Sequence, residues 1–217
     1  MKKKNRLIFI TNDDGYNADG IIVLKKINQP SFQDIWIFAP KYNQSAKSQS
    51  ITINKEINFI KSRNQEYIIK GTPTDCVMIG LNKIFAKNKK VTLLLSGVNE
   101  GANLGYDLLY SGTFAAAREG CLNGVKSIAM SIDKGKNNIN WKGLKYYAPK
   151  IINFIIKNKI PNNFFFNINF PNLSEKEIKG VKLVKCGYRK PGSIIKKIKN
   201  SYKIPSERKM MKDAKEG

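Results

Sequence analysis

Short apolar runs recur along the chain at intervals typical of a layered α/β fold. Residues 7–10, 35–39, 91–95, 127–132 and 164–168 form short runs rich in apolar side chains. Several of these runs end at Gly, Pro or Asn-Asp pairs, and runs of this length predict strands that are buried on both faces. The pattern therefore favours a parallel sheet.

Segments with helical spacing follow most of these strands. The predicted helices span residues 18–28, 72–86, 111–124 and 141–156. Thr72 and Pro73 mark the start of the second helix, and Ser111 can cap the third. Alternation of buried strands with helices predicts an α/β fold in which helices cover both faces of a mostly parallel sheet.

Two parts of the chain depart from this alternation. Residues around 51–53, 57–60 and 67–69 alternate between apolar and polar positions, which predicts antiparallel strands. From residue 180 the chain is dense in lysine and predicts only a short arm or hairpin. We therefore expect one catalytic domain over residues 1–179 and a C-terminal extension over 180–217.

Composition excludes several kinds of chemistry. The chain has 217 residues, enough for one domain with its own core, and no histidine. Ser-His-Asp triads, Cys-His dyads and histidine-ligated metals are therefore impossible. Cys76, Cys121 and Cys186 form no Cys-x-x-Cys pair, so we interpret them as buried thiols of a reducing compartment.

The net charge of +23 has two interpretations. A nucleic-acid or other polyanionic partner would explain it. However, 34 of the 39 basic residues are lysine, and they are spread along the chain with abundant Asn and Ile, which favours compositional drift. Readers of nucleic-acid bases favour arginine. We expect no dedicated nucleic-acid partner, although the field would attract phosphates.

No segment has the length of a membrane span, which needs about 20 apolar residues. Residues 1–4 resemble the basic start of a signal peptide, but only residues 7–11 follow as an apolar run. A signal peptide needs about 7–15 apolar residues at that point. We therefore expect a cytoplasmic protein with no membrane partner.

Polar residues follow three of the predicted strands. They are Asn12, Asp13, Asp14 and Gly15 after the first, Asn43, Gln44 and Ser45 after the second, and residues 96–105 after the third. Ligands of parallel sheets bind at the carboxyl ends of the strands. Adjacent carboxylates repel each other unless a cation lies between them, so Asp13 and Asp14 predict Mg²⁺ or Mn²⁺. The alternative is an ordinary turn that caps a helix.

Ser111, Gly112 and Thr113 lie at a predicted helix start, which can bind an anion or serve as a plain N-cap. The chain contains neither the GxGxxG nor the GxxxxGK[ST] signature, which disfavours dehydrogenases and kinases. No Cys is followed by Arg at the sixth position, which excludes a phosphocysteine route. The catalytic route that remains is attack of a metal-activated water molecule on a phosphoryl group.

Several motifs together resemble one known family. They are TNDDG at 11–15, AP at 39–40 with Asn43 and Ser45, GTPTDC at 71–76, SGVN at 96–99 with Gly101, NLG at 103–105, YSGT at 110–113 with Ala115 and Ala116, and NIN at 167–169 with Pro171. From residue 7 to about residue 189, the chain resembles the SurE family of metal-dependent 5′-nucleotidases.

The resemblance implies a three-layer, Rossmann-like fold with a C-terminal extension that is exchanged within a homodimer or tetramer. It also implies hydrolysis of nucleoside 5′-monophosphates, and of 3′-nucleotides and short polyphosphate in some members. One Mg²⁺ or Mn²⁺ per subunit would be bound. The implied metal ligands are Asp13, Asp14, Ser45 and Asn99, with Asp13 and Asn99 as catalytic candidates. The implied substrate and phosphate contacts are Asn12, Asn103, Ser111, Gly112 and Thr113.

The chain also departs from the family pattern. Lys41, Tyr42, Gln44 and Ala46 replace residues that are common in the family, so substrate contacts near Ser45 would differ. Residues 213–217 resemble the start of a final segment whose last strand is missing, so we expect a shortened C-terminus. Two other functions also fit the sequence: a polyanion-binding protein without catalysis, and an enzyme that acts mainly on polyphosphate.

Overall fold

A computed structural model describes residues 6–135, 138–158, 160–161, 163–187 and 195–203. Its main elements, in chain order, are β1 (Leu7–Thr11), α1 (Asp19–Asn28), β2 (Asp34–Pro40), β3 (Phe59–Arg63), β4 (Glu66–Ile69), α2 (Pro73–Phe85), β5 (Val91–Glu100), the 3₁₀ helix Gly105–Tyr110, α3 (Gly112–Leu122), β6 (Ser127–Ile132), α4 (Trp141–Lys157), β7 (Phe165–Phe170), β8 (Lys196–Ile198) and β9 (Ser201–Lys203).

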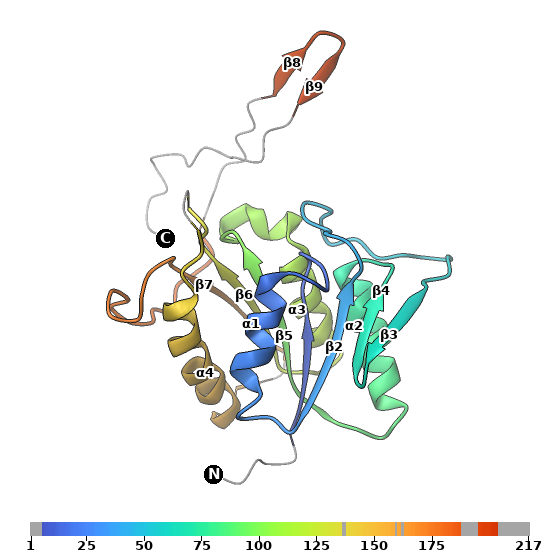
Figure 1. Ribbon diagram of the computed structural model, residues 1–217, viewed down its shortest axis with the longest axis vertical. Helices are drawn as coiled ribbons and strands as arrows, with labels where there is room; N and C mark the ends of the chain where they lie inside the picture. Colours follow the sequence, from blue (N-terminus) through green and yellow to red (C-terminus); the bar gives the residue numbers. More distant parts are fainter. Residues whose placement is uncertain (1–5, 136–137, 159, 162, 188–194, 204–217) are drawn as a thin grey trace.

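Seven strands form one sheet in the order β3-β4-β2-β1-β5-β6-β7 (Figure 1). Every neighbouring pair is parallel except β3 and β4, which are antiparallel at one edge. β1 lies in the middle, and the chain builds the sheet outward from it in both directions. The predicted α/β class with a mostly parallel sheet is confirmed.

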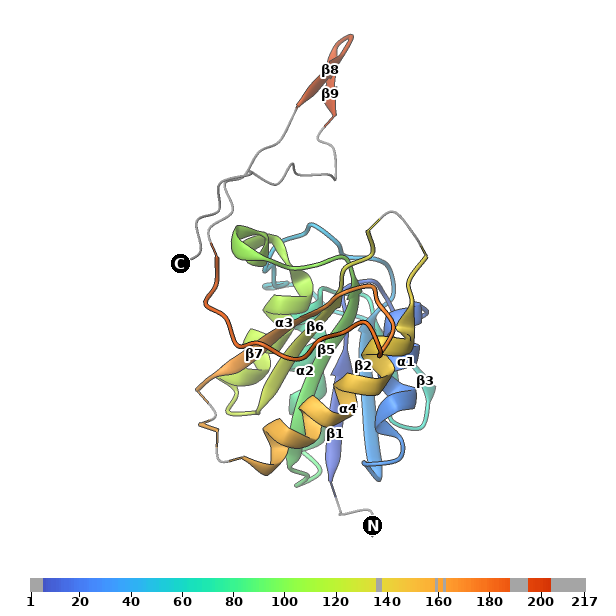
Figure 2. The same cartoon turned by 90° about the vertical axis from the view of Figure 1, so that its left-hand side faces the viewer.

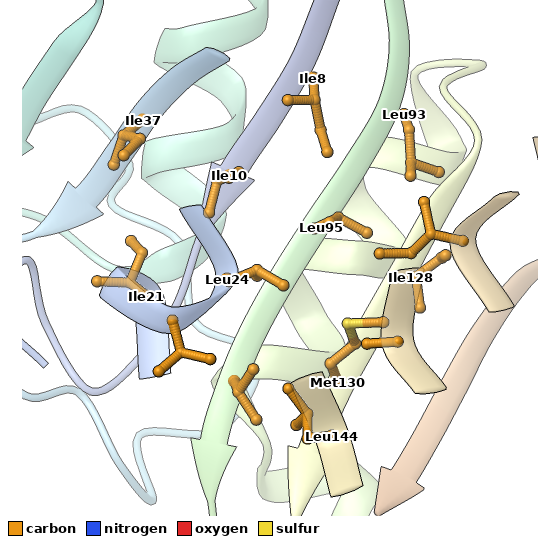
Figure 3. Packing of buried hydrophobic residues seen from close by; sticks show 14 of the residues in the cluster. Ile8, Ile10, Ile21, Leu24, Ile37, Leu93, Leu95, Ile128, Met130 and Leu144 are labelled. Carbon is orange, nitrogen blue, oxygen red and sulfur yellow. The ribbon is translucent and has the colours of Figure 1, made fainter. Parts of the chain in front are cut away.

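Helices cover both faces of the sheet, which gives three layers (Figure 2). On one face, α1 and α4 pack on β1, β5 and β6 around a core of mainly aliphatic side chains, including Ile10, Leu24, Leu95 and Met130 (Figure 3). On the other face, α2 and α3 pack over a more aromatic core. That core includes parallel-stacked Phe9 and Phe38, with ring centres 5.3 Å apart. Burial on both faces explains why the strands are nearly continuous apolar runs.

The helix starts follow the sequence signals. Thr72 accepts a hydrogen bond from the Asp75 N–H, and the Asp75 carboxylate accepts one from the Thr72 N–H, which completes a capping box before Pro73. Ser111 Oγ accepts from the Phe114 N–H and caps α3 as predicted. These two caps fix where α2 and α3 begin.

Three predicted segments are different in the structure. Residues 51–53 form no strand, because the Thr52 N–H and hydroxyl are both bound to the Asp75 carboxylate, at 2.9 and 2.7 Å. The antiparallel pair exists as β3 and β4, but β4 is also parallel to β2. β5 continues to Glu100, well beyond the predicted end at residue 95, because β6 pairs with both Asn99 and Glu100.

The chain after β7 packs against α4 and then extends away from the sheet. A Cβ at Gly143 in α4 would lie 2.4 Å from the Leu173 carbonyl oxygen, so this helix and the segment are in close contact. The short antiparallel pair β8 and β9 is the predicted hairpin (Figure 1). The division into a domain at 1–179 and an extension at 180–217 stays a prediction, and residues 1–4 and 213–217 lie outside the described residues.

Cys76 is buried, but Cys121 is half-buried and Cys186 is exposed, so the prediction of three buried thiols is wrong for Cys186. No disulfide joins these three residues in the described chain. Among the described residues, no helix has the length and apolar character needed to cross a membrane.

Candidate active site at the ends of the central strands

The central strands create a crevice where polar loops meet. The chain leaves β1 towards β2 on one side, while β5 lies on its other side. In parallel sheets, ligands bind at such a reversal of strand order, beyond the carboxyl ends of the strands. The loops after β1 and β2, the end of β5 and the start of α3 all lie at this edge.

Asp13 is buried at this edge, with 3% of its surface exposed. Its Oδ1 accepts a hydrogen bond from the Thr113 hydroxyl, and its carbonyl oxygen accepts one from the Gln44 N–H at 2.7 Å. A Cβ at Gly112 would lie only 2.9 Å from the Asp13 Cβ, so glycine is required there. Asp13 is therefore held between the loop after β2 and the start of α3.

Asp14 lies beside Asp13 and faces the end of β5. The Glu100 N–H is 3.4 Å from Asp14 Oδ2. Burial, and then the charge of Asp13, raise the pKa of Asp14 to about 7. Burial also raises the pKa of Asp13, against the opposing effect of its hydrogen bond from Thr113. Both shifts show that this site disfavours two bare carboxylates.

Asn12 shapes the turn that carries these aspartates. Its Nδ2 donates to the Gly15 carbonyl oxygen at 2.8 Å, and Gly15 has a φ of 105°, a conformation that favours glycine. Asn12 Oδ1 is buried and has no hydrogen-bond partner among the described residues. The side chain therefore holds the turn through one atom and leaves the other available.

Asn99 reaches this edge through the register of β5. Thr11 at the end of β1 pairs with Ser96 of β5. Asp14 follows Thr11 by three residues and Asn99 follows Ser96 by three, so both reach the same end of the sheet. Asn99 Nδ2 donates to the Gly101 carbonyl oxygen at 2.6 Å. This bond fixes the amide and leaves Oδ1 as the atom that can bind a cation.

Ser45 is exposed in the loop after β2, and its N–H donates to Asn43 Oδ1 at 2.7 Å. The preceding residue, Gln44, is the one bound to the Asp13 carbonyl. The backbone thus brings Ser45 close to the aspartates.

The start of α3 supplies polar groups from Ser111, Gly112 and Thr113. All three are buried, and Ser111 Oγ and the Thr113 hydroxyl have partners in Phe114 and Asp13. Thr113 therefore orients Asp13 directly, a contact that sequence reasoning did not anticipate.

Asn103 is held in a network of amides instead of pointing freely into the crevice. Its Nδ2 donates to Ser131 Oγ at 2.9 Å. Its carbonyl oxygen accepts from Asn167 Nδ2 at 2.9 Å and from Asn169 Nδ2 at 3.1 Å. The visible contacts of Asn103 thus tie the loop after β5 to β6 and β7.

Comparison with known proteins identifies the family of this chain. Residues 8–193 match the protein family described as Survival protein SurE. The chain belongs to the SurE family. A 5′-nucleotidase SurE from Paramagnetospirillum magneticum is 40% identical over 189 residues, which cover 87% of this chain and 72% of that protein. A second, from Wolbachia pipientis wMel, is 39% identical over 83% of this chain and 71% of its own length.

The same fold has been solved for a SurE relative. The crystal structure of the SurE protein from Aquifex aeolicus has a TM-score of 0.82 with this chain at 33% sequence identity. The match covers 93% of this chain and 83% of that chain. The SurE fold and the predicted family are therefore confirmed.

The residues of this SurE chain fit a hard divalent cation. Among the described residues, no group of three or more His, Cys, Asp or Glu side chains could hold a metal. Asp13 and Asp14 would supply the two charged ligands, and the oxygens of Asn99 and Ser45 are neutral. Carboxylate, amide and hydroxyl oxygens suit Mg²⁺ or Mn²⁺, which keep several waters. The adjacency of the two carboxylates and the buried Asn12 Oδ1, which has no hydrogen-bond partner among the described residues, support this fit.

Two neighbours of the site were missed from the sequence. Glu100 contributes its N–H to Asp14, and Lys134 forms an ion pair with Glu100 at 2.8 Å and lowers the pKa of Asp14 slightly. Neither Glu100 nor Lys134 lies in a sequence motif that marks it as a site residue. Knowing that β5 runs on to Glu100 would have placed the first of them.

Proposed function

We propose that this SurE chain is a metal-dependent 5′-nucleotidase that hydrolyses nucleoside monophosphates to nucleoside and phosphate. The carrying observation is the adjacent pair at the strand reversal, in which Asp13 is buried and Asp14 is half-buried, and both have raised pKa values. Relatives named 5′-nucleotidase SurE support the substrate class. Activity on 3′-nucleotides and short polyphosphate is proposed as secondary.

Asp13, Asp14, Asn99 and Ser45 would hold one Mg²⁺ or Mn²⁺ per subunit. When bound, such a cation offsets phosphate charge and lowers the pKa of a water molecule. Asp13, held by Thr113, is the residue positioned to orient or accept a proton from the attacking water. Asn99, fixed by its bond to Gly101, would orient the reacting phosphate.

The start of α3 would bind the phosphate. Helix N-termini favour anions because unpaired N–H groups and the helix dipole point outward. Gly112 allows this backbone to approach Asp13 closely, since a Cβ would collide with both Asp13 and Pro73. Ser111, Gly112 and Thr113 would therefore meet the phosphate where negative charge develops. Asn12 and Asn103 would shape the surrounding loops.

The test is phosphate release from AMP, GMP and tripolyphosphate by the full chain with EDTA, Mg²⁺ or Mn²⁺. We expect release only with metal, and loss of release in Asp14→Ala. Asp34→Asn is a matched control, because Asp34 is a carboxylate at the opposite end of β2 that pairs with Lys89 at 2.5 Å. Release by folded Asp14→Ala at the wild-type rate would refute the proposal.

We also propose a homodimer or tetramer that acts in the cytoplasm. Val181, Leu183 and Tyr202 of the C-terminal extension are exposed apolar side chains, which supports burial against another subunit. The absence of disulfides among the three cysteines agrees with a reducing compartment. Light scattering of wild type and Leu183→Asp tests the assembly, and a monomeric wild type would contradict it.

A further inference from the structure

A second cavity, of about 470 Å³, lies at the same edge of the sheet, between the loop after β2 and the start of α2. We call it the lysine pocket. The residues that matter here are Lys41, Tyr42, Gln44, Lys47, Lys70 and Thr72. They come from the carboxyl ends of β2 and β4, so the pocket opens where the candidate active site does.

The lysine pocket is continuous with the active site through two contacts. Gln44 lines the pocket, and its N–H donates to the Asp13 carbonyl oxygen at 2.7 Å. Pro73, which follows the pocket residue Thr72, would lie 3.0 Å from a Cβ at Gly112. The pocket therefore shares walls with both the aspartate turn and the proposed phosphate loop.

The positive charge of the lysine pocket is compensated only in part. Lys41, Lys47 and Lys70 are exposed, and no carboxylate lines the cavity. None of these three forms an ion pair within the part of the chain that the structure describes. The carboxylate of Asp75 accepts hydrogen bonds from the pocket residues Thr52 and Thr72, and it brings one negative charge near three lysines.

One further feature favours an anion in this pocket. The Lys41 Nζ lies 5.0 Å from the centre of the Tyr42 ring, a contact that holds the ammonium group at the rim. Three ammonium groups around one cavity are complementary in charge to a phosphate group.

We propose that the lysine pocket binds a second phosphoryl group of the substrate, beyond the one that is hydrolysed. Substrates that carry a second phosphoryl group, such as nucleoside bisphosphates, would then bind more tightly than the same nucleoside monophosphate. This inference rests on the proposed function and deepens it. The lysines would act on specificity by binding, while the chemistry would stay at Asp13 and Asp14.

The main rival explanation is the overall charge of +23, which attracts every polyanion. A matched control separates the two. Lys41→Gln/Lys47→Gln/Lys70→Gln removes three charges at the pocket, and Lys142→Gln/Lys145→Gln/Lys157→Gln removes three exposed charges on α4, which packs on one face of the sheet. Both variants have the same net charge, so only the position differs.

The experiment measures kcat/KM of the full chain for adenosine 5′-monophosphate, adenosine 3′,5′-bisphosphate and tripolyphosphate. The readout is the ratio of kcat/KM for each substrate with more than one phosphate to kcat/KM for the monophosphate. We expect at least one ratio to fall about tenfold in the pocket variant, since charge-assisted hydrogen bonds are lost. In the α4 variant both ratios should stay within about twofold. A fall with the bisphosphate alone would place the second phosphate on a nucleotide, and a fall with tripolyphosphate alone would place it in a chain of phosphates.

The proposal is overturned if neither ratio changes in the pocket variant, or if both variants lose equally. Binding of the same three compounds in EDTA, measured by calorimetry, provides a second readout without turnover. If wild type hydrolyses none of them, the proposed function fails, and the binding ratios still decide the pocket. The proposal is supported if wild type binds the substrates with a second phosphate more tightly than the monophosphate and only the pocket variant loses this preference. It is refuted if wild type shows no such preference.

Discussion

The carboxylates of this protein fall into two groups that the fold treats differently. Glu66, on β4, accepts hydrogen bonds from Lys25 and from Tyr16, both at 2.6 Å. Burial alone would raise the pKa of Glu66, but these two donors outweigh burial and lower it. Its charge is neutralised within the chain.

Asp13 and Asp14 are in the opposite situation. They are enclosed by the ends of β1 and β5, and burial together with their mutual repulsion raises the pKa of Asp14 to about 7. The cation that acts on Asp14, Lys134, is already paired with Glu100. In this fold, the carboxylate that stabilises the structure, Glu66, is paired with Lys25, whereas the charges of Asp13 and Asp14 are left for a ligand to neutralise.

Replacing Asp14 gives the largest expected effects, with opposite signs for activity and stability. In Asp14→Asn, metal-dependent phosphate release should fall by at least about 100-fold, because one of two charged ligands is lost. The metal-free protein should become more stable at pH 8 by on the order of 2 kcal/mol, since an ionised buried carboxylate is removed. Phosphate release and thermal unfolding in EDTA measure both. If metal-free Asp14→Asn were less stable than wild type at pH 8, the distinction between the two groups of carboxylates would be contradicted.

The pH dependence of metal binding is the next largest effect. A proton on Asp14 competes with the cation, so Mn²⁺ affinity should rise about tenfold per pH unit up to about pH 7 and then level off. The metal-free protein should respond in the opposite way. Above the ordinary pKa of 3.8 the unfolded carboxylate ionises freely while the folded one resists, so stability declines between about pH 4 and about pH 7.

Calorimetric titration with Mn²⁺ and thermal unfolding in EDTA, both across this pH range, test the two trends. Asp14→Asn is the control, because its metal-free stability should lose most of this slope. A metal affinity that does not change between pH 5 and pH 7 would contradict the raised pKa.

Removing the charge of Glu66 should affect stability instead of metal binding. Glu66→Gln leaves the half-buried Lys25 beside a neutral group, and we expect a loss of about 1–3 kcal/mol in the free energy of unfolding. Lys25→Gln should lose a similar amount, and the double variant should lose less than the sum. Chemical denaturation measures all three. If Glu66→Gln lowered Mn²⁺ affinity as much as Asp14→Asn does, the two groups of carboxylates would not be distinct.

Lys134→Gln should have the smallest effect. Its side chain is 54% exposed and its ion pair with Glu100 is screened by solvent, so the melting temperature should stay within experimental error. The midpoint pH of Mn²⁺ binding should rise slightly, because Lys134 lowers the pKa of Asp14. A large change in either quantity would make Lys134 part of the site.

Local signals predicted much of the fold because they act over a few residues. The buried strand before Asn12, the cap at Thr72 and the cap at Ser111 all depend on neighbouring residues, and the structure has each of them. Residues 51–53 were predicted wrongly because a distant partner, Asp75, takes the hydrogen-bonding groups of Thr52. The end of β5 was missed because its extension depends on pairing with β6.

The alternation of strands and helices, the family and the residue types available for a hard cation can all be recognised in the amino-acid sequence. Which of those residues meet depends on folding, since contacts such as Thr113 with Asp13 join positions that are 100 residues apart. Folding also decides charge, because burial and partners separate Glu66 from Asp14, although both are ordinary carboxylates in the sequence. The periodicity of apolar positions depends only on neighbouring residues, whereas desolvation and long-range contacts exist only after the chain has folded.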